Sequence, residues 1–144
     1  MRSDDGSAAL EFIVVGVILL VPLAYLVIAL GAIQDQTLGA EAAARHTARA
    51  TALAPDSKAA ADAGDTVLAG VIDEYDLDPD TTEVELSCRP ASEACPSAGV
   101  TLIVRVTARV RLPLVPPVLG VDRATEVPVQ AEAVQKLSRT WGAP

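Results

Sequence analysis

The most prominent pattern along the chain is a long apolar run near its amino terminus. Residues 12–33 contain no charged side chain. As a helix this run is about 33 Å long and matches a bilayer core of about 30 Å, whereas the apolar region of a secretory signal is only about 7 to 15 residues long. The pattern therefore predicts a retained transmembrane helix over residues 12–33. Removal as a signal peptide, which would leave a secreted soluble protein, is the less favoured alternative.

The predicted helix continues beyond the apolar run. Pro22 lies near the middle of the span, where it removes one backbone hydrogen bond and would kink the helix or let a neighbouring side chain approach. Residues 34–53 are rich in alanine, and Glu41 precedes Arg45 by one helical turn. We expect one helix over residues 7–54, about 70 Å long, half in the membrane and half exposed.

A second, shorter helix is predicted after Pro55. Asp56 or Ser57 can cap its start. Its apolar positions recur at helical spacing and form one stripe: Val67, Leu68, Val71, Ile72 and Tyr75. We expect a sheet to cover this stripe.

Three later segments alternate between apolar and polar residues, at 82–88, 100–112 and 127–133. The side chains expected to be buried are Val84, Leu86 and Cys88, then every second residue from Val100 to Leu112, then Val127, Val129, Ala131 and Ala133. Arg105, Arg109 and Arg111 point outward from the middle segment, while glutamates point outward from the other two. Because opposite charges favour cross-strand pairing, we place residues 100–112 in the centre of an antiparallel sheet. Pro128 fits only an edge strand.

These elements define an α+β fold class. It consists of a long N-terminal transmembrane helix that continues outside, a short second helix and a three-stranded antiparallel sheet. The predicted organisation is a cytoplasmic leader at residues 1–6, the long helix at residues 7–54 and an extracytoplasmic α+β domain at residues 55–144.

Composition narrows the classes of function. The chain has 144 residues, a net charge of -8 and 3% aromatic residues. A chain of this length accommodates one domain. Its acidic balance argues against nucleic acid as a partner, and its few aromatic side chains leave little with which to stack bases. We expect neither a nucleic-acid partner nor a small-molecule substrate.

Cys88 and Cys95 enclose a six-residue loop that closes readily as a disulfide in an oxidising compartment. This pair places the C-terminal part of the chain outside the membrane. A zinc site is the competing interpretation, but it lacks donors because His46 is the only histidine. We therefore expect no metal.

Two loops carry candidate binding residues. Asp76, Asp78 and Asp80 are spaced as in a calcium loop, but the required glycine and final glutamate are absent, so a solvated acidic turn is favoured. Residues 113–122 are unusually apolar for a loop. They either pack beneath the sheet, which we favour, or dock a partner through Leu114, Val115, Val118 and Leu119.

Catalytic patterns do not emerge from the sequence. We find no nucleophile with an adjacent base, no paired acids, no phosphate-binding loop and no metal cluster. We therefore expect a protein that is not an enzyme, with no catalytic residues and no cofactor.

The segment before the apolar run carries the most specific pattern. Gly6 is followed by Ser7, and Glu11 stands at the membrane edge next to Phe12. A carboxylate there is also favoured by the helix dipole alone. The pattern nevertheless resembles the type IV prepilin signal. The resemblance implies cleavage after Gly6 by a prepilin peptidase, a free amine on Ser7, and pairing of Glu11 with the amine of a neighbouring subunit.

The closer resemblance is to the TadE family of tight-adherence pilus systems. Ala9-Leu10-Glu11-Phe12 and the helix-interrupting Pro22 carry it, over roughly the first 35 residues. The leader differs from that of an ordinary prepilin, because it has one arginine and two aspartates instead of a basic stretch. The resemblance implies a pilin-like fold, and a minor pilin or pseudopilin whose Glu11 and Phe12 set the assembly register.

The implied partners are other pilin subunits, pilus assembly proteins, the prepilin peptidase and membrane lipid. The implied location is the cytoplasmic membrane, crossed once, with incorporation into a surface pilus as a further step. The alternative is an unprocessed single-pass protein whose extracytoplasmic domain is a binding module.

Overall fold

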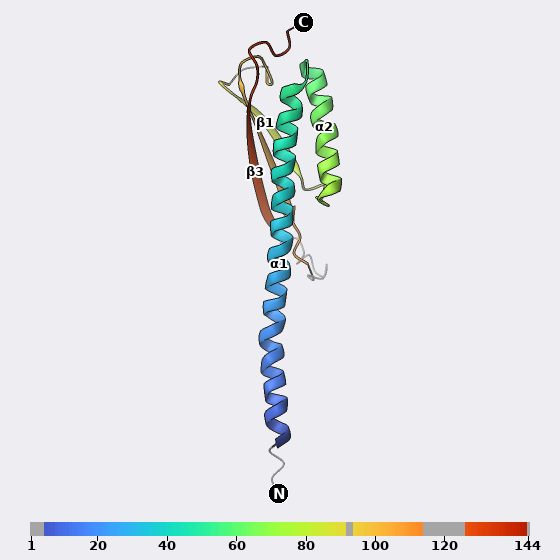
Figure 1. Ribbon diagram of the computed structural model, residues 1–144, viewed down its shortest axis with the longest axis vertical. Coiled ribbons are helices and arrows are strands. Elements are labelled where there is room, and N and C mark those ends of the chain that lie inside the picture. Colours follow the sequence, from blue (N-terminus) through green and yellow to red (C-terminus); the bar gives the residue numbers. More distant parts are fainter. Residues whose placement is uncertain (1–4, 92–93, 114–125, 144) are drawn as a thin grey trace.

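The architecture is seen in a computed structural model, which describes residues 5–91, 94–113 and 126–143 (Figure 1). Its elements follow the chain as α1 (Asp5–Leu53), α2 (Ser57–Glu74), β1 (Glu83–Arg89), β2 (Thr101–Val110) and β3 (Val127–Lys136). The α+β class, the long apolar N-terminal helix, the second helix and the three-stranded antiparallel sheet are confirmed.

Helix α1 is the axis of the molecule (Figure 1). It is a single helix of 49 residues that starts two residues before Ser7 and ends at Leu53. Its C-terminal half is rich in alanine, and four of these alanines are buried in the core: Ala40, Ala43, Ala44 and Ala48. Small side chains let the neighbouring elements approach closely, so this half of α1 can pack against α2 and the sheet together.

Helix α2 begins at Asp56, one of the two capping residues that the sequence allows. The side chain of Asp56 accepts a hydrogen bond from the backbone N–H of Ala59 at 2.8 Å. The apolar stripe of α2 packs against α1, however, and α2 lies across α1 from β3 (Figure 1). The expectation that a sheet covers this stripe is therefore wrong. The alanine face of α1 covers it instead, and Val71 is buried there.

The sheet has the order β1-β2-β3, with both pairs antiparallel. The arginine-bearing strand is in the centre, as predicted. Arg105 stands opposite Glu85 on one side and Glu132 on the other. Its guanidinium lies 3.6 Å from the Glu85 carboxylate and 3.0 Å from that of Glu132. Pro128 lies in the edge strand β3.

The core lies between the inner face of the sheet and α1. Leu102, Val104 and Val106 are completely buried, and the predicted inward residues from Val100 to Val110 are all buried. The alternation is interrupted at Ile103, which is buried on the other face, and Leu112 lies beyond the end of β2 and is only partly buried. The prediction fails at Leu86, which is 43% exposed. Leu86 belongs to β1, a sheet edge that α1 does not cover, because α1 packs against β2 and β3.

Candidate functional site

The N-terminal half of α1 is an apolar rod that no other described element covers (Figure 1). The helix is long and apolar enough to cross a membrane, by length and composition, and only 6% of its most apolar window is buried. Large aliphatic side chains cover its surface, with Ile18, Leu19 and Leu20 each about two-thirds exposed. In water this surface would be strongly unfavourable, so it needs lipid or other helices around it.

Glu11 stands at the start of this rod. It is exposed, and within the described residues it makes no ion pair or side-chain hydrogen bond. The neighbouring Phe12 is 80% exposed. Gly6 and Ser7 lie in the first turn of α1, five and four residues before Glu11. A carboxylate at the edge of an apolar surface is stabilised by a cation, and the described part of the chain brings none to it.

Pro22 lies inside α1, which is helical on both sides of it. Because proline has no N–H, the carbonyl of Ile18 loses its usual partner in the helix. In an apolar environment this carbonyl is an acceptor that a neighbouring helix could satisfy. The predicted role of Pro22, a kink or a place for a neighbour's side chain, stays a prediction.

The disulfide predicted between Cys88 and Cys95 is present, with their Cα atoms 5.8 Å apart. Cys88 is buried at the end of β1, so the bridge ties the loop after β1 to the core. This loop lies at the end of the domain remote from the apolar half of α1 (Figure 1).

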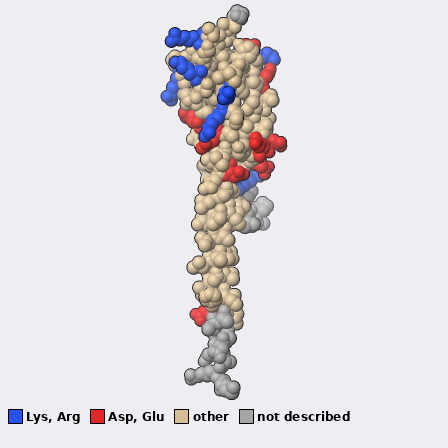
Figure 2. Space-filling model, in the orientation of Figure 1, with Lys and Arg blue, Asp and Glu red and all other residues tan. Residues whose placement is uncertain are grey.

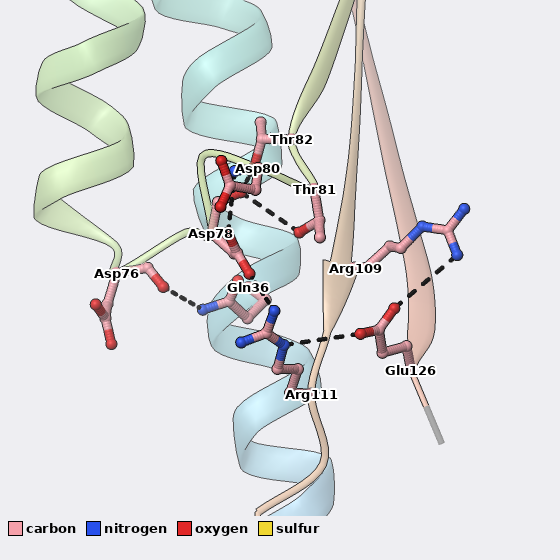
Figure 3. A network of polar contacts seen from close by, with 9 residues as sticks. All are labelled: Gln36, Asp76, Asp78, Asp80, Thr81, Thr82, Arg109, Arg111 and Glu126. Atoms are coloured by element: carbon pink, nitrogen blue, oxygen red, sulfur yellow. Dashed lines mark hydrogen bonds and ion pairs between the residues drawn. The ribbon is translucent and has the colours of Figure 1, made fainter. Parts of the chain in front are cut away.

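The opposite end of the domain, next to the apolar half of α1, is fixed by polar contacts (Figure 3). The side-chain amide of Gln36 on α1 donates to the carbonyls of Tyr75 and Asp76 at 3.3 and 3.2 Å. These carbonyls follow the last turn of α2, where helix carbonyls have no partner within the helix. Gln36 therefore joins the end of α2 to α1.

Two arginines complete this network. Arg111 pairs with Asp78 at 2.7 Å and with Glu126 at 3.7 Å, and Arg109 reaches Glu126 at 4.0 Å. The contacts join the turn after α2 to the ends of β2 and β3 (Figure 3). Neither the Arg111–Asp78 pair nor the role of Gln36 follows from the patterns in the sequence. The only signal was that the alternating arginines extend past the strand to Arg111.

An open cavity of about 560 Å³ lies beside this network, with Asp35, Asp76 and Asp80 among its lining residues. The acidic turn does not form a calcium loop. Asp78 points to Arg111 and accepts from the N–H of Asp80, so its oxygens are already engaged. Within the described residues no group of three or more potential ligands could hold a metal ion.

A second hollow, of about 210 Å³, separates β1 from α2. Leu86, Val84 and Leu68 give it apolar walls, and Thr47 of α1 contributes to its lining. The hydroxyl of Thr47 is buried, and within the described residues it has no hydrogen-bond partner. This hollow explains the exposure of Leu86.

The remaining residues singled out from the sequence are those of the apolar loop at residues 113–122 and His46. Leu114, Val115, Val118 and Leu119 lie outside the described residues, so the choice between a packed loop and a docking loop stays open. His46 is exposed on α1.

Comparisons of the chain with protein-family models, with curated proteins and with solved structures found no match.

Proposed function

We propose that this chain is a TadE-like minor pilin or pseudopilin, a structural subunit of a tight-adherence type IV pilus assembly machine. The observation that carries the proposal is the bare apolar half of α1, at whose start Glu11 stands without a partner in the described chain. A helix that serves only as a membrane anchor needs no carboxylate at this position. In a bundle of subunits, however, a carboxylate that must pair with a cation of a neighbouring helix fixes the axial position of the two helices relative to each other.

The mechanism begins with processing. Hydrolysis of the peptide bond between Gly6 and Ser7 by a prepilin peptidase would leave a protonated amine on Ser7. Within one helix this amine lies about 6 Å from Glu11 along the axis. A neighbouring subunit shifted by that distance would bring its own amine beside Glu11. Because an unpaired charge in an apolar bundle is costly, this shift is favoured over others.

The extracytoplasmic half of α1 supports the same function. Helix α2 and the sheet cover most of this half, but one stripe along it remains exposed. The exposed stripe contains Leu38, Arg45, Arg49 and Leu53. Leu38 and Leu53 are 58% and 74% exposed. The exposed stripe continues the bare surface of the membrane half, so α1 can contact neighbouring helices along its whole length.

The proposed location is the cytoplasmic membrane, with residues 55–144 outside. The disulfide supports this side, because such bonds persist in oxidising compartments. The proposed partners are other pilin subunits, assembly proteins, the peptidase and lipid. The protein contributes packing and register, with no catalytic step of its own.

The deciding measurement is the mature amino terminus, obtained by intact mass and N-terminal sequencing of protein from its native membrane. The proposal expects a chain that begins at Ser7. A chain that retains Met1 would reduce Glu11 to an interfacial charge and would refute processing.

A substitution tests the role of Glu11. Glu11→Ala removes the carboxylate but leaves the apolar surface intact, so the protein should remain in washed membranes. Surface pili should fall about tenfold or more, because the subunit's amine loses its partner in an apolar environment. Asp35→Asn, at the other end of the apolar run, is the matched control and should leave piliation unchanged. Normal piliation in the Glu11 variant would contradict the mechanism.

The hollow between β1 and α2 favours a second candidate function, an unprocessed membrane-anchored binding module. Its apolar walls and the unpaired Thr47 hydroxyl suit an apolar partner segment that also offers one hydrogen-bonding group. This function requires the leader to be retained, so the same amino-terminal measurement separates the two candidates.

A further inference from the structure

The two ends of the extracytoplasmic domain carry opposite charge. Arg89 and Lys136 flank Thr101 in one row across the sheet, at the end remote from the membrane helix. Arg139 follows β3 at the same end, and its side chain lies near Gly99. We call Arg89, Lys136 and Arg139 the basic rim. All three are exposed.

The end next to the membrane helix is acidic. Helix α2 runs down to this end, and β1 starts from it (Figure 1). Five exposed carboxylates lie there, which we call the acidic end: Asp73, Glu74, Asp76, Asp80 and Glu83. On the face drawn in Figure 2, lysines and arginines lie mainly over the upper part of the domain, whereas acidic side chains lie mostly over its middle and lower part, with some at the upper right edge.

Neither set is neutralised within the described part of the chain. No ion pair involves a residue of the basic rim or of the acidic end, although other charges pair readily. Arg105 is held in the middle of the sheet by two glutamates, and Arg111 is held at the base by Asp78. The basic rim and the acidic end are therefore both unpaired, and so are the exposed Asp35, Arg49, Asp56 and Asp65 elsewhere in the domain. Of these, Asp56 lies at the remote end, where the basic residues outnumber it.

We propose that the basic rim of one copy binds the acidic end of a second copy that is displaced along the helix axis, with the two membrane helices parallel. This inference rests on the proposed function, because only an assembly that leaves the bilayer plane allows such a displacement. The contact is heterologous, joining two different surfaces, so it can repeat without closing.

The charge distribution distinguishes two arrangements of parallel copies. Copies side by side at the same height bring rim beside rim and acidic end beside acidic end. Both contacts are repulsive within a Debye length of about 8 Å at physiological salt. An axial displacement replaces these contacts by attractive ones. The same charges would therefore weaken lateral association in the membrane and favour the staggered assembly.

The size of the displacement follows from α1. Asp35 and Leu53 mark the two ends of the domain on this helix, and 18 residues of helix rise by about 27 Å. The register set by Glu11 corresponds to a step of about 6 Å. Each successive copy in the assembly would thus be displaced by about 6 Å, and four or five such displacements add up to the length of the domain. The end-to-end contact would therefore join a copy to the fourth or fifth copy after it, while Glu11 would join adjacent copies. The two contacts are separate and can be tested separately.

A water-soluble carbodiimide gives the test, because it joins an amine to a carboxylate with which it is already in contact. An amide forms, and the water that is lost hydrates the carbodiimide to a urea. The chain has two lysines, Lys58 and Lys136. Lys58 lies 3.0 Å from Asp62 in the same chain, and the link between them would show that the reagent has reached the domain.

The experiment treats intact piliated cells and analyses the covalent dimer by peptide mass spectrometry. The expected product is an amide between Lys136 and a carboxylate of the acidic end. Such a link must join two copies, because Lys136 and the acidic end lie at opposite ends of one domain. Its yield should fall in high salt. Arg89→Gln should lower it about two- to fivefold, the value of one exposed ion pair.

Arg105→Gln is the matched control, because it removes the same charge from the same face of the sheet but from its middle. It should leave the Lys136 link unchanged. An equal loss in both variants would show a general effect of charge or folding and would overturn the proposal.

The remaining outcomes separate this inference from the proposed function. If the dimer carries only a link between the Ser7 amine and Glu11, the end-to-end contact is refuted and the register mechanism stands. If it carries only the Lys136 link, the end-to-end contact stands, and the register mechanism is decided separately by the mature amino terminus and the Glu11→Ala variant. If Lys136 is linked to a different protein, the partner is not a second copy and the inference is wrong.

Discussion

Gly39 determines how closely α2 can lie against α1. A Cβ atom at this position would be 2.8 Å from Cβ of Tyr75 and 3.2 Å from a methyl carbon of Leu77. The Tyr75 Cβ is fixed to the backbone, so it cannot move away without shifting the end of α2. A glycine in mid-helix is otherwise unfavourable, and here the close packing of the two helices explains it.

Gly39→Ala is therefore expected to destabilise the protein. The gain in helix propensity, about 1 kcal/mol, is smaller than the cost of overpacking at this contact, about 1–3 kcal/mol. Thermal unfolding of the detergent-solubilised chain should show a lower midpoint. Gly70→Ala is the matched control on α2, where no atom lies within 4 Å of the added Cβ, and it should stabilise by about 0.5–1 kcal/mol. A Gly39 variant as stable as the Gly70 variant would contradict the close approach.

At the scale of elements, the packing of α2 on α1 leaves the β1 edge of the sheet partly uncovered. The inner side chains of β2 are buried against α1, whereas Leu86 of β1 faces the hollow beside α2. Two leucines with the same place in an alternating pattern therefore have different environments. Leu102 is completely buried and Leu86 is 43% exposed.

Truncation of these two leucines should show the difference. Leu102→Ala should cost about 2–5 kcal/mol, because it removes buried contacts and leaves a cavity. Leu86→Ala should cost less than about 1.5 kcal/mol, because much of the side chain is already in contact with solvent. Denaturant unfolding of the full chain measures both. Equal costs would indicate that β1 is covered in solution.

At the scale of the whole molecule, α1 holds the domain on a rod whose lower half is apolar. The first and the last described residues lie at opposite ends of the molecule (Figure 1). The disulfide lies at the end remote from the rod, and the network of Arg109 and Arg111 lies at the end next to it. The proposed topology therefore puts the bridge far from the membrane surface and the polar network close to it.

Protease treatment of spheroplasts tests this topology. If residues 55–144 lie outside, added protease should remove them and leave a membrane-protected fragment that contains the apolar half of α1. The intact chain should also be two hydrogens lighter than its sequence mass, because the disulfide is formed. Protection of the domain in spheroplasts whose cytoplasmic proteins are intact would place it on the wrong side for the proposed function.

Local patterns in the sequence determined much of this structure. Apolar continuity identified α1, and the Asp56 cap identified the start of α2. Alternation and charge placed β2 between β1 and β3, because Arg105 needs a carboxylate on each side. The cysteine spacing gave the disulfide. Each of these features depends on residues close in the chain or on a simple pairing of opposite charges.

Only the tertiary structure decided what covers each apolar face. The helical spacing in α2 shows that a stripe must be buried, but burial of apolar surface has no direction, and the alanine face of α1 proved to be its partner. The exposure of Leu86 and the contacts of Gln36 and Arg111 follow from that packing. Such contacts join residues far apart in the chain, so their geometry exists only after the elements have packed together.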